Sequence, residues 1–130
     1  MGAFDTLRIA GSALGMHQTW LDSLANNIAN VNTVVATSQT AFQTQTPIVR
    51  AMAGGGVEVA GMALSDPQGR MVSDPANPMA DADGYVRAPE DDLATQMTQL
   101  VMAQRGFQAS VQVTKDAQET YRAALEIGRG

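Results

Sequence analysis

The chain begins and ends with segments in which hydrophobic residues recur every three or four positions. In the first segment, from about Asp5 to Val31, one apolar row repeats every seven residues and a companion row lies three residues further on. The first row is Leu7, Leu14, Leu21 and Ile28, and the companion row is Ala10, His17, Leu24 and Val31. Four heptads with a single polar residue in the seam predict a long amphipathic helix of the kind found in coiled coils.

The last segment predicts a second, longer helix that starts after Pro89. A proline followed by Glu90-Asp91-Asp92 is typical of a helix start, where the helix dipole favours negative charge. Apolar and aromatic residues then follow with spacings typical of one helix face: Leu93, Met97, Leu100, Phe107, Val111, Tyr121 and Leu125. No proline occurs after Pro89, so we expect about 38 helical residues, roughly 57 Å in length.

The helical pattern breaks between residues 32 and 89. All five prolines and the run Gly54-Gly55-Gly56 lie in this middle region. Short strand-like stretches at 47–51, 57–64, 70–73 and 85–87 lie between these breakers, which predicts one or two hairpins and much loop.

These elements predict a mainly α fold, in which long N- and C-terminal helices pack as a coiled coil and a small β-rich insert lies between them. The corresponding parts of the chain are residues 1–33, 34–89 and 90–130. Two helices of unequal length do not bury two apolar seams by folding back alone. We therefore expect partner helices from other subunits.

The composition excludes several kinds of partner. Of the 130 residues 45 % are hydrophobic but only 5 % are aromatic, which favours thin apolar seams over a thick core. The net charge is −5 and the eight Lys and Arg residues are scattered, so nucleic-acid binding has no electrostatic basis. No apolar run approaches the roughly 20 residues that span a membrane. The first ten residues lack the pattern of a secretory signal, so we expect any export to proceed without a cleaved signal peptide.

Residues that could carry chemistry are few. His17 is the only histidine and there is no cysteine, so neither a metal site nor a catalytic triad is expected, and we predict no enzymatic activity and no cofactor. At its seam position His17 is expected to pack and to hydrogen-bond across an interface. Residues 79–90 partly match a calcium-binding EF-hand loop through Asp81 and Asp83, but Met79 stands where the first carboxylate is needed. A structural turn is favoured there, and calcium binding remains the alternative.

Four asparagines lie between residues 26 and 32, at the end of the first helix. Asparagine is a mediocre helix former, because its amide competes for the backbone. One interpretation is that these residues cap the helix end. The interpretation that we favour is that Asn26, Asn27 and Asn30 share one side and bond to neighbouring subunits through amides that both donate and accept.

The stretch Asn26-Asn27-Ile28-Ala29-Asn30-Val31-Asn32-Thr33 resembles the signature at the end of the first helix in bacterial flagellar basal-body rod and hook proteins. Residues 55–59, 77–86 and 105–110 resemble corresponding parts of a proximal rod subunit in that family. The chain departs from the family at Val34 and Val35, where glycine and an aromatic residue often follow the signature. It also carries Ser110 at a place where the family often has asparagine. The resemblance covers nearly the whole chain.

This resemblance implies a structural subunit of the flagellar proximal rod, which polymerises helically in the periplasm into the hollow drive shaft that carries torque from motor to hook. It also implies export by the flagellar type III apparatus, contacts with other rod subunits and with copies of itself, and a surrounding bushing ring as a further partner. The terminal helices would form the core of the tube. A sister rod or hook-family subunit, and a soluble helical adaptor or calcium-responsive module, remain as alternatives.

The seam and the asparagine signature together define a candidate assembly interface. Its residues are Leu7, Leu14, Leu21, Leu24, Asn26, Asn27, Ile28, Asn30, Val31, Leu93, Met97, Leu100, Phe107, Val111, Tyr121 and Leu125.

Overall fold

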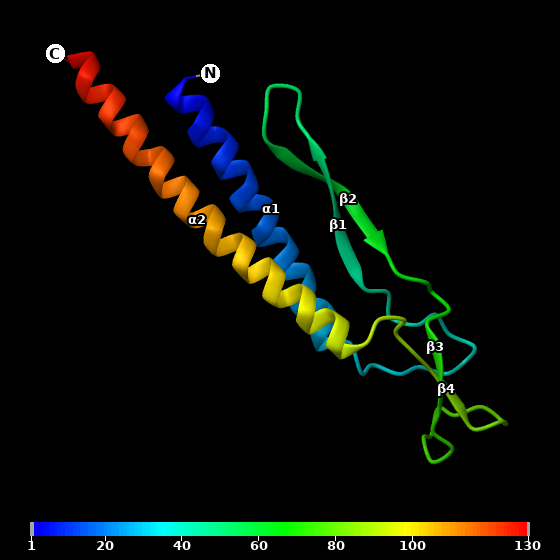
Figure 1. The fold of residues 1–130 in the computed structure, drawn as a ribbon. Coiled ribbons are helices and arrows are strands. Elements are labelled where there is room, and N and C mark those ends of the chain that lie inside the picture. Colours follow the sequence, from blue (N-terminus) through cyan, green and yellow to red (C-terminus); the bar gives the residue numbers. More distant parts are fainter. Residues whose placement is uncertain (1, 130) are drawn as a thin grey trace.

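The computed structural model describes residues 2–129, which form an elongated molecule built on two long helices. Helix α1 (Ala3–Ala29) and helix α2 (Leu93–Arg129) lie side by side and run in opposite directions, so that both chain ends lie at the same end of the molecule (Figure 1). Helix α2 starts at Leu93 because the Asp92 carboxylate accepts a hydrogen bond of 2.8 Å from the backbone N–H of Thr95. The two predicted helices are confirmed, with ends that differ by two or three residues from the expectation.

The middle of the chain forms two separate two-stranded antiparallel sheets. Strands β1 (Gln45–Ala51) and β2 (Val57–Leu64) form a long hairpin, and strands β3 (Arg70–Ser73) and β4 (Tyr85–Ala88) form a short second pair. All four strands were predicted from their positions between proline and glycine breakers. The sheet insert is small, so the fold is mainly α as expected.

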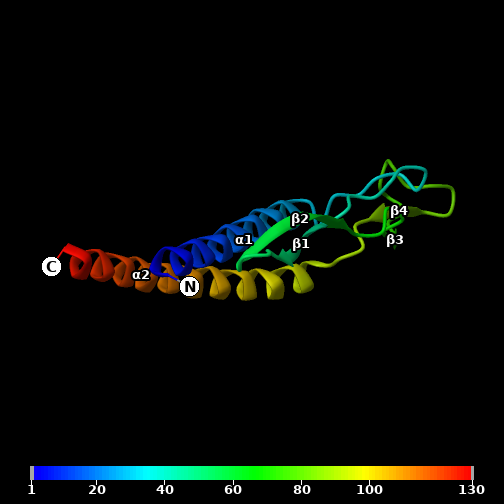
Figure 2. The ribbon, with the colours of Figure 1, turned by 90° about the horizontal axis from the view of Figure 1, so that it is seen from above.

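The tip of the β1–β2 hairpin lies beside the N-terminal part of α1 (Figures 1 and 2). Hydrogen bonds connect the two. The guanidinium of Arg8 donates to the backbone carbonyls of Gly54 at 2.8 Å and Gly55 at 3.2 Å. The hydroxyl of Ser12 accepts a bond of 3.1 Å from the N–H of Val57. A side chain at Gly56 would come within 2.7 Å of this hydroxyl, and its φ of 93° favours glycine. The glycine run is therefore a turn shaped to lie against α1.

The seam between the two helices is lined on α2 by small and polar residues. The buried residues of α2 repeat every seven positions and are Gln96, Ala103, Ser110 and Ala117. The short side chains of Ala103, Ser110 and Ala117 leave room for α1 on this face of α2. The residues predicted for this seam lie elsewhere: Leu100, Phe107, Val111 and Tyr121 are half-buried beside it, while Leu93, Met97 and Leu125 are 45 %, 45 % and 51 % exposed.

On α1 the companion row is the more buried of the two predicted rows. Ala10 and Leu24 are buried, as is Val31 just past the helix end, whereas the row of Leu7, Leu14, Leu21 and Ile28 is half-buried. Phe4 and Tyr121 form an aromatic contact with ring centroids 6.2 Å apart near the start of α1. Beyond this contact the last turns of α2 are exposed. Neither helix has a stretch that is long and apolar enough to cross a membrane within residues 2–129.

Candidate assembly interface

Asn27 joins three elements of the fold at a buried point. Its amide nitrogen donates to the backbone carbonyl of Gln45 at 2.9 Å and to the side-chain oxygen of Gln96 at 3.0 Å. Its amide oxygen accepts a bond of 2.9 Å from the N–H of Gln45. The side chain thus ties α1 to the first residue of β1 and to α2, and it is only 1 % exposed.

Within the chain the donor and the acceptor of Asn27 are already used, which favours a role in holding the subunit together. Its contact with a neighbouring subunit stays a prediction. Asn30 is the C-terminal cap residue of α1, and its amide bonds back to the carbonyl of Asn26 at 3.0 Å. The capping interpretation thus describes Asn30. The side chain of Asn26 is exposed, so its contact with a neighbouring subunit stays a prediction.

His17 contacts α2 at the position of a glycine. Its Nδ1 lies 2.9 Å from the backbone carbonyl of Ala13 and 2.9 Å from the hydroxyl of Ser110. The imidazole lies over Gly106, where an added Cβ would come within 2.4 Å of Nε2. The expectation that His17 packs and hydrogen-bonds across an interface is confirmed, and the interface is the one between α1 and α2. Because Gly106 has no side chain, it leaves room for the imidazole ring against α2.

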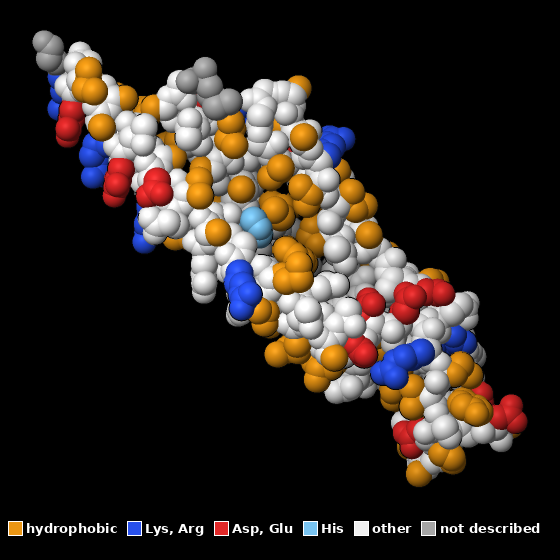
Figure 3. All heavy atoms as spheres, viewed as in Figure 1, with side chains coloured by type: hydrophobic (Ala, Val, Ile, Leu, Met, Phe, Trp, Pro, Cys, Tyr) orange, Lys and Arg blue, Asp and Glu red, His pale blue; other side chains and the backbone are white. Residues whose placement is uncertain are grey.

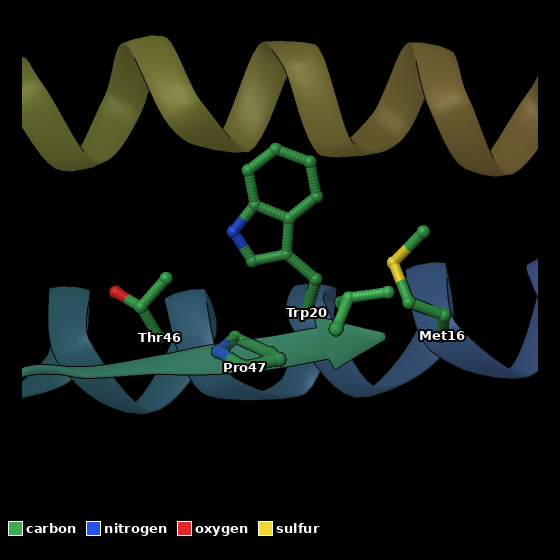
Figure 4. A pocket seen from close by; sticks show the side chains of 5 residues that line it. Met16, Trp20, Thr46 and Pro47 are labelled. Atoms are coloured by element: carbon green, nitrogen blue, oxygen red, sulfur yellow. The ribbon is translucent and has the colours of Figure 1, made fainter. Parts of the chain in front are cut away.

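An apolar hollow lies on the face of the molecule where α1 forms the floor between α2 and the hairpin. Hydrophobic side chains gather along this face around His17, the pale blue side chain of Figure 3. The hollow has a volume of about 280 Å³ and is lined by Met16, Trp20, Thr46, Pro47 and Val49. Figure 4 shows that Trp20 projects from α1 toward α2, beside β1.

The sequence interpretation did not assign Met16 or Trp20 to the interface. The sequence did contain a signal for Trp20, because it is the only tryptophan and directly precedes the seam residue Leu21. The indole N–H of Trp20 is buried and has no hydrogen-bond partner among residues 2–129. An aromatic ring that lines an open apolar hollow is typical of a contact surface.

Large apolar side chains are also exposed along one flank of α2. Leu93, Met97 and Val101 follow one another at intervals of four residues, and each is 45 % exposed. Residues four apart are neighbours on a helix surface, so these three form a continuous apolar stripe. We refer to Leu93, Met97 and Val101 as the outer stripe of α2.

In the acidic turn between β3 and β4, the Asp81 carboxylate is already bonded by backbone groups of the turn itself. One oxygen of Asp81 accepts bonds of 2.9 Å from the N–H groups of Asp83 and Tyr85, and the other accepts a bond of 3.1 Å from the hydroxyl of Thr37. The bond from Tyr85 is the chief cause that lowers the pKa of the Asp81 carboxyl. Gly84 follows at a φ of 83°, as a tight turn requires. In residues 2–129 no group of three or more His, Cys, Asp or Glu side chains is arranged to hold a metal ion. This geometry favours the structural turn over the calcium loop.

Comparison with protein families defines the class of the chain. Residues 7–37 match the family described as flagella basal body rod protein. Residues 83–127 match the C-terminal region described as flagellar basal body rod FlgEFG protein C-terminal. The two matches cover most of α1 and most of α2, which are the elements that carry the seam, and they indicate a flagellar rod protein.

Individual relatives narrow this class. The flagellar basal-body rod protein FlgC of Salmonella typhimurium is 30 % identical over 134 aligned residues, which cover 99 % of this chain and 100 % of the relative. FlgC of Escherichia coli O6:H1 is 31 % identical with the same coverage, and FlgC of Bacillus subtilis is 29 % identical over 150 residues. The chain belongs to the FlgC family of flagellar basal-body rod proteins. It is accordingly a structural rod subunit of the flagellar basal body, where it assembles with other rod subunits.

Proposed function

We propose that the chain forms the proximal part of the rod, where it polymerises helically with copies of itself and with other rod subunits into the hollow shaft that transmits torque to the hook. The observation that supports this proposal most strongly is where the small and the large side chains of α2 lie. Small residues fill the contact with α1, while the large apolar residues of the outer stripe lie in solvent. Contiguous apolar surface of this kind is typical of a protein-protein contact.

The surfaces left open by the fold differ from one another. The outer stripe is convex and lies on α2, whereas the hollow around Trp20 is concave and lies between α1 and β1. When unlike surfaces of identical subunits meet, the contact is heterologous and leads to an open helical polymer unless the rotation closes a ring. A rod requires such non-closing contacts.

In the assembled rod we propose that α1 and α2 pack with helices of neighbouring subunits as a coiled-coil core. The half-buried rows, which include Leu7, Leu14, Leu21 and Phe107, would become fully buried there. Residues 1–33 and 90–130 would then form the core of the tube, and residues 34–89 would form an outer domain. The exposed end of α2, with Leu125, would then pack against a neighbour.

The remaining parts of the proposal rest on the resemblance to rod proteins. The subunit acts without catalysis, is exported by the flagellar type III apparatus without a cleaved signal peptide, and lies in the periplasm. The outer domain would contact the next subunits and a surrounding bushing ring. None of these roles requires a cofactor.

The variant Met97→Asp tests the assembly role without touching the seam between α1 and α2. Met97 is 45 % exposed, so we expect the variant to fold and to be exported, but not to enter basal bodies or support swimming. Ala109→Asp is the matched control, because it adds the same charge at an exposed residue of the same helix, outside the candidate interface. Incorporation would be followed by immunoblotting of purified basal bodies. Normal incorporation of Met97→Asp would contradict the role of the outer stripe.

A further inference from the structure

A second, polar pocket lies in the insert, away from the apolar hollow. It has a volume of about 130 Å³ and is formed where three segments meet: the loop 37–40, the turn at Pro67 and Gln68, and Arg87 on β4. This volume is sufficient for several water-sized groups. None of its residues belongs to the candidate assembly interface defined from the sequence.

The walls of this pocket are held in place by backbone contacts. The N–H of Ala41 donates to the carbonyl of Pro67 at 2.9 Å, which joins the loop to the turn. Arg87 and Val35 exchange two backbone bonds of 2.9 Å, which join β4 to the chain just before the loop. Gly69 packs so closely that an added Cβ would lie 2.0 Å from the carbonyl oxygen of Ala88. The pocket is therefore preformed, which lowers the entropic cost of filling it.

Arg87 brings a positive charge to the pocket without a negative partner. Its guanidinium donates to both oxygens of Gln68, backbone and side chain, and to the backbone carbonyl of Thr37 at 2.6 Å. All three acceptors are neutral. Its Nε is buried and has no hydrogen-bond partner within residues 2–129. Among residues 2–129 the ion pair within 4.0 Å joins Arg50 to Glu58, so no carboxylate of these residues lies within 4.0 Å of the Arg87 nitrogens.

The rest of the lining adds polar groups that the fold does not use. Ser38, Gln39 and Thr40 line the pocket, are exposed to solvent, and make no side-chain hydrogen bond to other described residues. The side-chain nitrogen of Gln68 is also free to donate, because only its oxygen is bound to Arg87. A half-buried cation surrounded by spare donors is matched by an anion, since partly buried charges are normally paired.

We propose that this pocket binds a carboxylate group. A cation is repelled by Arg87, and an apolar side chain gains little because Pro67 is the single apolar residue in the lining. A planar carboxylate accepts several bonds at once and forms charge-assisted bonds with a guanidinium. The group comes from an acidic side chain of a neighbouring subunit or from a free small carboxylate. The first source rests on the proposed rod assembly, to which each copy brings 13 acidic residues.

The direct test is a titration of the full chain with sodium acetate at constant ionic strength, followed by NMR signals of the Arg87 Nε–H and the Gln39 and Gln68 side-chain amides. We expect saturable shifts with acetate and none with acetamide, which has the same shape without the charge. Arg87→Gln should weaken acetate binding about tenfold or more. Shifts that do not saturate, that occur equally with acetamide, or that survive Arg87→Gln would overturn the proposal.

Because Arg87 also holds the loop and the turn, a second variant keeps the test independent of folding. In Ser38→Ala/Thr40→Val the hydroxyls that are lost bond to no described residue, so we expect unchanged thermal unfolding and acetate binding weakened severalfold. Unchanged acetate affinity in this folded variant would contradict the assigned pocket.

The source of the carboxylate is identified in cells with the same double variant. Reduced incorporation into basal bodies indicates an acidic side chain of a neighbouring subunit, and normal incorporation indicates a free small carboxylate. The acetate titration tests only the pocket, and the Met97→Asp variant tests only the assembly. Failure of either proposal is therefore distinguishable from failure of the other.

Discussion

The contact between His17 and Gly106 allows a prediction whose sign differs from the usual effect of the same substitution. Replacing a glycine inside a helix by alanine normally stabilises the protein by about 1 kcal/mol. At Gly106 the new methyl group would lie 2.4 Å from Nε2 and 2.6 Å from Cδ2 of the imidazole. Ordinary contacts lie at 3.4–4 Å, so the ring or the helix must move by roughly 1 Å.

The magnitude follows from what such a movement breaks. Displacing the ring removes the two contacts of Nδ1, to the carbonyl of Ala13 and the hydroxyl of Ser110, each 2.9 Å long. Nδ1 carries either a proton or a lone pair, so the two contacts amount to one full hydrogen bond, worth about 1 kcal/mol. Overpacking without ring movement costs about 1–3 kcal/mol. After subtraction of the helix-propensity gain of about 1 kcal/mol, we expect Gly106→Ala to lower the free energy of unfolding by up to about 2 kcal/mol.

The assay is urea denaturation of the full chain, followed by circular dichroism at 222 nm. Gly15→Ala is the matched control, because an added Cβ there has nothing within 4 Å and should stabilise the chain by up to about 1 kcal/mol. Adding His17→Ala to Gly106→Ala should remove the clash, so the two substitutions should couple by about 1 kcal/mol or more. If Gly106→Ala is as stabilising as Gly15→Ala, the contact does not fix the helix pair.

Three further predictions concern the insert and its connection to α1. Asn27→Ala leaves the backbone groups of Gln45 unpaired and should lower the unfolding free energy by about 2–4 kcal/mol in urea denaturation, whereas exposed Asn26→Ala should change it by less than about 0.5 kcal/mol. Gly69→Ala, at a φ of 58° and facing a carbonyl oxygen at 2.0 Å, should lower it by about 3 kcal/mol or more; a wild-type melting curve would contradict this. Hydrogen bonds to the folded carboxylate lower the pKa of Asp81, so its contribution is present above the ordinary aspartate pKa of about 3.9 and is lost as the pH falls through the folded value. Unfolding curves between about pH 2 and 5 should therefore vary less with pH in Asp81→Asn than in the wild type.

The elements that local chemistry determines could be predicted from the sequence. The four strands lie where prolines and glycines interrupt short runs of β-forming residues, and such turn signals act over only a few positions. The two helices follow from heptads that need no knowledge of distant partners. Their ends were placed less well, because Asp92 rather than Pro89 turned out to start α2.

The centre of the helix contact could not be predicted in the same way. A hydrophobic pattern gives weight to large side chains, whereas α2 uses Ala103, Ser110 and Ala117 against α1. Closeness of two backbones depends on short side chains, which carry little hydrophobic signal. The same seven-residue repeat was present in the sequence, but only the fold shows which of two neighbouring rows faces the partner.

The polar sites depend on partners that are distant in the chain. Asn27 bonds to residues 18 and 69 positions away, so no local pattern distinguishes it from exposed Asn26. The pocket around Arg87 combines three segments that only the strand pairing brings together. For these residues the chemistry of the side chain was visible in the sequence, but its bonding partners were not.

The attachment of the hairpin to α1 at both of its ends has a consequence for how the molecule opens. Arg8 and Ser12 hold the tip, and Asn27 holds the start of β1, so neither the hairpin nor α1 can detach without breaking bonds at both ends. Amide hydrogens of the hairpin and of α1 should therefore exchange with solvent together, as one cooperative unit. The last turns of α2, which are exposed beyond Tyr121, should exchange earlier and independently. The hairpin and α1 should therefore resist local opening, whereas the last turns of α2 should open readily.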